Sequence, residues 1–250
     1  ASDINVALMN VASAQGTLFV KRTAAASGFD DVAQAEAIFN EQGVPSYDRY
    51  LALSTRDYNG MASNLAGRQN MTDLPKEAYR RAYVGMIASF DTYKLDYANR
   101  VAAAGGGAGL TIDTRDVAVN YYIPQATSAS VGGKINVDNR YQTVTVSSTA
   151  SVAAGDAFTI AAVNAVHHIT KQDTGQLKTF RVISVTNGTT MVISPPIISN
   201  QVANDASAQY QNCVVNTKSA TSAIVFLNTV AGYANPFWQR DALEILPGRY

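Results

Sequence analysis

The sequence has 250 residues, 47% of them hydrophobic, so the chain is long enough to bury one large core or two smaller ones. Lys plus Arg and Asp plus Glu number 19 each, which gives a formal net charge of zero. This balance argues against a nucleic-acid-binding protein, because binding phosphates requires an excess of basic side chains. No apolar run approaches the ~18 residues of a membrane-spanning helix. Charged residues make up only 15% of the chain, and a neutral, lightly charged surface favours association with other chains.

The first hundred residues are predicted to alternate helices with short strands. Asp30 and Asp31 follow Ser27 as in a capping box, and the apolar residues after them repeat at helical spacing until Gly43 and Pro45 end the helix. The predicted helices are residues 4–15, the segment between Ser27 and Gly43, residues 55–65 and residues 73–83. The predicted strands are residues 17–20, 50–53 and 84–90.

Period-two alternation begins after a glycine-rich stretch, Ala102–Gly109, which is predicted to be a flexible domain boundary. Val, Ile, Thr and Ser then dominate the sequence, and short strands at this spacing predict a small barrel or sandwich. The predicted strands are Leu110–Ile112, Val117–Tyr122, Lys134–Val137, Tyr141–Ser147, Ala157–Ala161, Lys178–Val185 and Thr189–Ser194.

Two turns are predicted between these strands. Asn187 and Gly188 lie between two alternating runs, and this pair is favoured in tight hairpin turns because it tolerates positive φ. Gly155 and Asp156 form a second turn of the same kind. The strand pattern is therefore predicted to be held together by short, well-defined connections.

The composition changes back after the alternating region. Residues 199–212 are polar and are predicted to be a return linker, and residues 221–246 resemble the first part of the chain. A compact β module inserted into a mixed host domain would produce this order. Such an architecture occurs in assembling proteins as well as in enzymes, so the pattern alone does not choose between structural and catalytic roles.

Residues that could carry catalysis or bind a metal are few. His167 and His168 are the only histidines, and neighbours on a strand point to opposite faces, so they cannot easily chelate one ion. The glycines at 105–107 lack the Lys and Ser or Thr of a phosphate-binding loop, and no G-x-S-x-G elbow is present. Cys213, the only cysteine, is interpreted as a small buried apolar residue. We therefore expect no enzyme, no cofactor, and no catalytic, cofactor-binding or metal-binding residues.

Several short stretches follow one another in a recognisable order. In the β-rich part they are KINVDNRYQTVTV (134–146), GDAF (155–158) and FRVISVTNGTTMVISP (180–195). Elsewhere they are AEAIF (35–39), DYN (57–59), LPKEAYR (74–80), VGMIASFD (84–91) and FWQRDALEI (237–245). In this order they resemble the coat proteins of the P22-like short-tailed bacteriophages. No single motif decides the resemblance, which depends on the whole series.

The resemblance implies a major capsid protein of the Hong Kong-97 fold type, a structural subunit of an icosahedral shell. In that family an axial domain surrounds the capsomer axis, and the short-tailed phages insert a β-barrel domain into it. The implied fold class is α+β. The implied domains are the end of the spine helix with the first part of the axial domain (1–100), the inserted β-barrel domain (101–215) and the return segment of the axial domain (216–250).

The resemblance also implies the partners and the location. Copies of the chain would form pentamers and hexamers in a virion capsid assembled in the bacterial host cytoplasm, through contacts of the host domain. Scaffolding and portal proteins would bind largely outside this sequence, and neither a membrane nor a sequence-specific nucleic acid would be a partner. Because the family's N-terminal arm, extended loop and most of the spine helix would precede residue 1, the chain is expected to be an internal fragment.

The inserted domain would stiffen the subunit and contact neighbours, because the family's insert carries a long loop that reaches another capsomer. The matching segment, Ile123–Lys134, contains no acidic residue, so it would use backbone, hydroxyl and van der Waals contacts, with Lys134 as its one charge. The implied contact residues are Ile123, Pro124, Gln125, Ser128, Ser130, Gly132, Gly133 and Lys134. The expected structural turns are Gly155, Asp156, Asn187 and Gly188. This loop and Ala102–Gly109 would supply the adaptability that several positions in a shell require.

Two other classes of function stay open. One is a carbohydrate-binding or adhesive β-barrel module on an α/β carrier, which an exposed platform of Tyr121, Tyr122 and Tyr141 would favour. The other is a hydrolase, which a cleft holding both histidines beside a serine and a carboxylate would favour.

Overall fold

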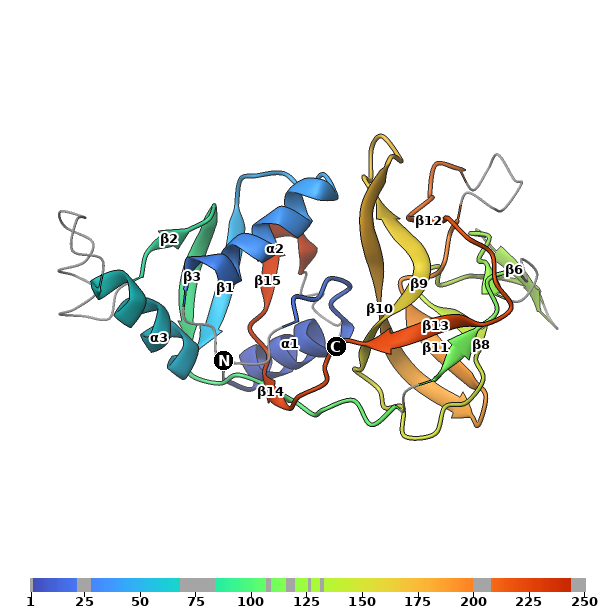
Figure 1. Ribbon diagram of the computed structural model, residues 1–250, viewed down its shortest axis with the longest axis horizontal. Coiled ribbons are helices and arrows are strands. Elements are labelled where there is room, and N and C mark those ends of the chain that lie inside the picture. The colour runs from blue at the N-terminus through green and yellow to red at the C-terminus, as the bar shows by residue number, and fades with distance from the viewer. Residues whose placement is uncertain are drawn as a thin grey trace. The chain divides into compact units, whose positions relative to one another are not determined.

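The computed structural model describes residues 2–21, 28–67, 84–106, 109–115, 120–125, 127–130, 133–199 and 208–243, with only the backbone described at 2, 127–130 and 133–136. The helix expected at 73–83 lies outside these residues. The chain forms two compact units, which Figure 1 shows. We call them the mixed unit (Ala1–Ser13, Val20–Val101 and Ala231–Tyr250) and the β unit (Ala14–Phe19 and Ala102–Val230).

The mixed unit is built on a four-stranded sheet of order β15-β1-β3-β2, in which β1 and β3 are parallel and the other neighbours antiparallel. Its strands are β1 (Arg49–Ser54), β2 (Met86–Ile87), β3 (Phe90–Leu95) and β15 (Phe237–Gln239), and β4 (Arg100–Val101) pairs separately with β14 (Gly232–Tyr233). Its helices are most of α1 (Ser2–Gln15), α2 (Phe29–Glu41), α3 (Thr55–Ala66) and the 3-10 helix η1 (Arg240–Ala242). Since β15 pairs with β1, residues late in the chain complete a sheet that begins early in it.

Helix α2 confirms the helix expected after Ser27, with its start moved by one residue. The N-cap is Gly28, whose backbone N–H donates to the carboxylate of Asp31 at 3.3 Å. An acid three residues after the cap satisfies a backbone donor that the first helical turn leaves free. At the other end, the ring of Phe39 packs 5.5 Å from Phe90 and 5.2 Å from Phe237, which joins the helix to the sheet.

A buried arginine holds the loops at one end of this sheet. Arg49 is 1% exposed, and its guanidinium donates to the carbonyl oxygens of Val44 (2.7 Å) and Pro45 (2.8 Å). It also donates to Asn40 Oδ1 (2.8 Å) and Ser89 Oγ (3.1 Å). Burial of a charged group is costly unless its donors are satisfied, and here four donor–acceptor pairs meet that requirement.

The β unit is a curled seven-stranded sheet of order β5-β13-β9-β10-β11-β8, with β12 paired to β9. Its strands are β5 (Thr111–Ile112), β8 (Gln142–Thr145), β9 (Ala157–Val166), β10 (Asp173–Asn187), β11 (Thr190–Ser194), β12 (Cys213–Val215) and β13 (Ser222–Phe226). A bridge between Ile112 and Val146 brings the two ends of this order together. The helices and this curled sheet together agree with the expected α+β class.

The core of the β unit lies inside the curl. Phe158 stacks on Phe180 with ring centroids 5.7 Å apart and contacts Phe226 at 6.1 Å. Burying a side chain of this size stabilises a fold by roughly 1.5–3 kcal/mol. Cys213 is fully buried in this core, as expected, and burial raises the pKa of its thiol to about 12.

Three expectations about the order of elements need correction. The boundary expected at residue 215 lies inside the β unit, because Ser222–Phe226 pairs with β9 and the unit extends to Val230. Residues 17–20 form no strand, because they pair with none of the described strands, and the Gly16 carbonyl just before them accepts instead from the side chain of Arg181. Residues 120–122 are not a strand either, and the rest of that predicted strand, 117–119, lies outside the described residues.

Candidate inter-subunit contact surface

The segment expected to reach a neighbour is a β-hairpin of its own. Strands β6 (Thr127–Ser130) and β7 (Gly133–Asn136) pair antiparallel, with Ser128 opposite Ile135 and Ser130 opposite Gly133. They form a separate two-stranded sheet rather than an extension of the seven-stranded one (Figure 1). The sequence pattern predicts a loop here and a strand only from Lys134. Gly132 lies outside the described residues.

The hairpin is entered through Ile123, Pro124 and Gln125. Ile123 is 40% exposed, and no side-chain position is described for Ser128, Ser130 or Lys134. The backbone thus places Ser128, Ser130, Gly133 and Lys134 on one hairpin that follows Ile123–Gln125 in the chain.

Asn139 fixes the base of this hairpin. Its Oδ1 accepts from the hydroxyl of Tyr122 at 2.7 Å and from the backbone N–H of Gln125 at 3.0 Å, and its Nδ2 donates to the Gln125 carbonyl at 2.8 Å. The asparagine therefore joins the chain entering the hairpin to the chain leaving it. The sequence did not single out this residue, because an asparagine in a turn does not show which distant backbone group it will bond.

Beside it, Asp138 and Arg140 form an exposed ion pair with Nη2–Oδ2 at 2.6 Å. Hydrogen bonds from the Arg140 side chain and backbone lower the pKa of Asp138 to about 2. The Arg140 guanidinium also lies 5.2 Å from the centre of the Tyr141 ring. Lys134 is the one charged residue of the segment Ile123–Lys134, but the ion pair of Asp138 and Arg140 follows only a few residues later.

A cavity of about 610 Å³ opens at the same place, lined among others by Pro124, Gln125, Arg140, Tyr141 and Tyr210. Its aromatic, proline and amide lining is of the kind that binds ligands or peptides, and its size is within the usual range for such sites. Pro124 and Gln125, which precede the hairpin, and Asn139, which follows it, belong to the lining of this cavity.

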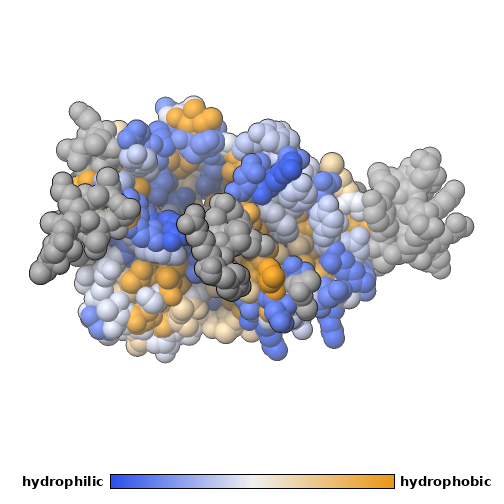
Figure 2. Space-filling model, turned by 180° about the vertical axis from the view of Figure 1, so that it is seen from behind, coloured by the Kyte–Doolittle hydropathy of each residue, from blue (hydrophilic) through white to orange (hydrophobic). Residues whose placement is uncertain are grey.

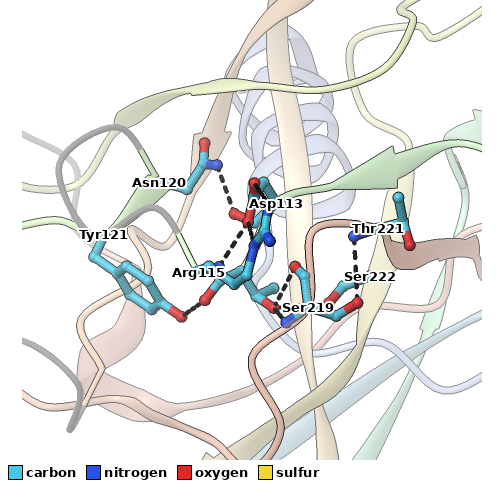
Figure 3. Close-up of polar contacts among 8 residues, drawn as sticks. Asp113, Arg115, Asn120, Tyr121, Ser219, Thr221 and Ser222 are labelled. Carbon is cyan, nitrogen blue, oxygen red and sulfur yellow. Dashed lines mark hydrogen bonds and ion pairs between the residues drawn. The ribbon is translucent and has the colours of Figure 1, made fainter.

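A second polar cluster, around Thr114, ties the entry segment to the end of the β unit (Figure 3). The Thr114 hydroxyl lies 2.8 Å from Ser222 Oγ and accepts from the Ser219 backbone N–H at 2.8 Å. The Tyr121 hydroxyl donates to the Thr114 carbonyl, and burial raises the pKa of Tyr121 to about 12. Asn120 donates to the carbonyl of Asp113 at 2.6 Å. These bonds are among neighbouring loops and hold the path of the chain that leads to Ile123.

The expected turns lie at strand ends. Gly155 has φ +92° and Asp156 is 4% exposed, so glycine is required at the first position by backbone geometry. Asn187 ends β10, and Gly188 with Thr189 makes the two-residue connection to β11. Neither Asn187 nor Gly188 has a φ in the left-handed region, so the hairpin forms without the positive φ that the sequence analysis gave as its reason.

The histidines are engaged in their own turn. The Nδ1 of His167 accepts the backbone N–H groups of Ile169 and Thr170, both at 3.3 Å, and the ring of His168 stacks on it at 5.5 Å. Neither imidazole takes part in the cluster around Thr114. Across the ranges that the structure describes, no three His, Cys, Asp or Glu side chains gather as metal ligands, and no helix is long and apolar enough to cross a membrane.

The tyrosines do not form an exposed platform for a sugar. Tyr121 is 6% exposed inside the core, and Tyr122 is half-buried with its hydroxyl on Asn139. Of the three, Tyr141 alone lines the cavity. The observation that would have favoured a carbohydrate-binding module is therefore absent from these residues.

A sequence model of the family described as "P22 coat protein - gene protein 5" matches residues 1–250. The chain belongs to the P22 coat protein family. The chain is also similar to a solved structure named "CUS-3 coat protein I-domain", with 40% identity over 50% of this chain and 99% of that one, at a TM-score of 0.34. As a coat protein, the chain is a structural subunit of a phage capsid. It is located in the virion, whose capsid is assembled from multiple subunits.

Proposed function

We propose that this coat protein is a Hong Kong-97-type subunit in which the mixed unit is the axial domain and the β unit is an inserted β-barrel. The support is topological. The chain leaves the mixed unit after Val101 and returns to it at Ala231, so the β unit lies within the sequence of the other. The bridge between Ile112 and Val146 joins the ends of the seven-stranded sheet in the way that a barrel requires.

In this proposal the subunits assemble as pentamers and hexamers through the mixed unit, and the hairpin β6–β7 binds a neighbouring subunit. The single observation that carries the hairpin's role is that it stands apart from the seven-stranded sheet. An isolated two-stranded hairpin is only marginally stable in water, because it has little core of its own. A second chain packed against it, or paired with one of its edges, would supply what is missing.

The rest of the surface is compatible with contacts between copies. Large apolar residues reach solvent on both units, including Met86 (68% exposed), Tyr47 (66%) and Ile169 (71%). Figure 2 shows hydrophobic residues gathered in patches between hydrophilic ones. Patches of this kind on a protein with zero net charge favour association.

The test is to replace residues 127–136 by a short Gly-Ser link in the complete coat protein and to follow shell formation by electron microscopy and sedimentation. We expect an unchanged melting temperature of the β unit, because no strand of the seven-stranded sheet is removed, together with a loss of closed shells. The matched control replaces the tip of the β9–β10 hairpin, residues 168–171, by the same number of Gly and Ser residues and keeps its shells. Normal shells from the first variant would refute the hairpin's role.

A further inference from the structure

The glycine-rich stretch that was expected to be flexible is packed against the β unit as far as Gly106. A Cβ atom on Gly106 would lie 2.4 Å from the ring of Phe226, and one on Gly105 would lie 2.9 Å from the Ser151 carbonyl oxygen. Glycine therefore serves close approach at these positions rather than freedom of the chain. The Ala104 backbone N–H also donates to the Asn228 carbonyl at 2.7 Å.

Asn228 links this entering segment to the end of the β unit. Its side chain, 4% exposed, donates to the Ala102 carbonyl at 3.1 Å and to Asp156 Oδ1 at 2.9 Å, and it accepts from the Ala157 N–H at 3.0 Å. Asp156, also 4% exposed, accepts from the Ala153 N–H at 2.9 Å. One amide group thus bonds to three residues on two other pieces of chain, Ala102 and the adjacent pair Asp156 and Ala157.

Arg181 extends the same cluster to a third connection. It is 4% exposed, and its guanidinium donates through Nη1 to the Gly155 carbonyl at 2.7 Å and through Nε to the Gly16 carbonyl at 2.8 Å. The guanidinium carbon lies 5.0 Å from the centre of the Phe19 ring. Burial lowers the pKa of Arg181 to about 10, and the nearby Asp156 carboxylate opposes that shift.

We infer that Asp156, Asn228 and Arg181 form a junction lock, one buried polar cluster that holds every segment by which the chain enters or leaves the β unit. These segments are 14–19, 102–106 and the end of the unit at 228–230. The three polar side chains are positioning residues, since they act on the paths of the connecting segments. The connecting segments therefore keep fixed paths where they join the β unit.

Stabilisation of the core does not explain why these three polar side chains are buried. Burying an amide, a carboxylate and a guanidinium costs free energy that their hydrogen bonds only offset, whereas apolar residues would stabilise a core directly. Such clusters contribute specificity of arrangement when all their members are bonded. The bonds here run to backbone atoms of the connections, which is where a specific arrangement is needed.

The experiment measures amide hydrogen exchange and tryptic cleavage in the unassembled protein, so that it does not depend on shell assembly. Asn228→Asp keeps the acceptor for Ala157, removes the donor to Ala102 and places a second carboxylate beside Asp156. We expect exchange at 102–106 to accelerate roughly tenfold, the effect of losing one such hydrogen bond, while the β10–β11 amides stay protected. Arg181→Lys should speed cleavage after Lys21 through release of 14–19.

Gly188→Ala is the control, because a Cβ there meets nothing within 4 Å and the backbone is not left-handed. It should leave both readouts unchanged. Unchanged exchange at 102–106 in Asn228→Asp would overturn the lock. So would an acceleration across β9, β10 and β11 in Asn228→Asp as large as that at 102–106, since the side chain would then contribute to the stability of the whole core and not to the connections in particular. The lock and the proposed assembly role fail separately, because exchange at 102–106 in Asn228→Asp decides the first and shell formation after replacement of residues 127–136 decides the second.

Discussion

The two units each bury an arginine, and the arginines hold different kinds of connection. In the mixed unit, Arg49 bonds to residue 40 in the last turn of α2, to residues 44 and 45 in the loop that follows, and to residue 89 just before β3. In the β unit, Arg181 bonds to Gly16, 165 positions away, and to Gly155. Arg49 therefore holds segments that are near it in the chain or in the sheet, whereas Arg181 binds a segment that is distant in sequence and takes no part in the seven-stranded sheet.

This difference indicates where each unit is vulnerable. In the mixed unit, Arg49 and its hydrogen bonds form a clamp at the end of the sheet, so we expect loss of this clamp to lower the stability of the whole unit. The β unit has a large apolar core around Phe158, Phe180 and Phe226, and its clamp can be weakened while the core persists. Four variants test this contrast.

The largest effect is expected from Arg49→Met. The change leaves four acceptors without their donor in a buried place, and we expect the free energy of unfolding of the mixed unit to fall by about 3 kcal/mol. Trp238, the single tryptophan, lies on β15 opposite Tyr50, so its fluorescence in urea reports this unit. An unfolding midpoint equal to that of the parent protein would show that the clamp is not needed for stability.

Arg181→Met should act on the β unit by a smaller amount. Two backbone acceptors lose their donor, and one of them, on Gly16, can turn to water, so we expect a loss of about 2 kcal/mol. The unfolding transition of the β unit, followed by circular dichroism, should shift to lower urea concentration. The transition of the mixed unit, followed by Trp238 fluorescence, should stay in place. A shift of the Trp238 transition alone would reverse the assignment of the two clamps.

Lys178→Met should stabilise the β unit. Lys178 is 7% exposed, and burial lowers its pKa from the ordinary value of 10.5. Below the folded-state pKa the buried ammonium destabilises the fold; as the pH rises from there to 10.5 the unfolded chain binds more protons than the folded one, so stability increases with pH in that window. We expect the variant to gain about 1–2 kcal/mol at neutral pH and to lose this pH dependence. Lys171→Met, at a half-exposed position, is the control and should retain it.

The smallest effect is expected at the base of the hairpin, where Asp138 and Arg140 are exposed to solvent. Exposed ion pairs contribute little to stability, so Arg140→Gln should leave both melting transitions in place at neutral pH. It should nevertheless raise the pKa of Asp138 from about 2 toward the ordinary 3.8, because that pKa is set mainly by bonds from Arg140. The depressed pKa stabilises the folded state above pH 4 and that contribution disappears as the pH falls through 2. Titration of the Asp138 carboxyl carbon by NMR measures the shift, and an unchanged value would mean that the pair does not form in solution.

The sequence by itself determined the elements whose signal is local. Alternation places Val144, Val146, Met191 and Ile193 on the buried side of the β unit, and helical spacing places Val32, Ala35 and Phe39 on the buried side of α2. The ordered series of short stretches pointed to the coat protein family that the match over residues 1–250 then established. Each of these inferences uses residues that are close together, or a series that can be followed in order along the chain.

Tertiary structure alone decided which distant segments meet. The pattern at 222–226 is that of a strand in either unit, and only its pairing with β9 assigns it to the β unit. A run of glycines is typical of a flexible linker, yet the ring of Phe226, 120 residues beyond Gly106, makes it a packed contact. Nothing in the sequence predicts that Asn228 bonds to Ala102 or that Arg181 bonds to Gly16. A hydrogen bond needs only a donor and an acceptor that lie close together, and burial of the core is what brings these segments close.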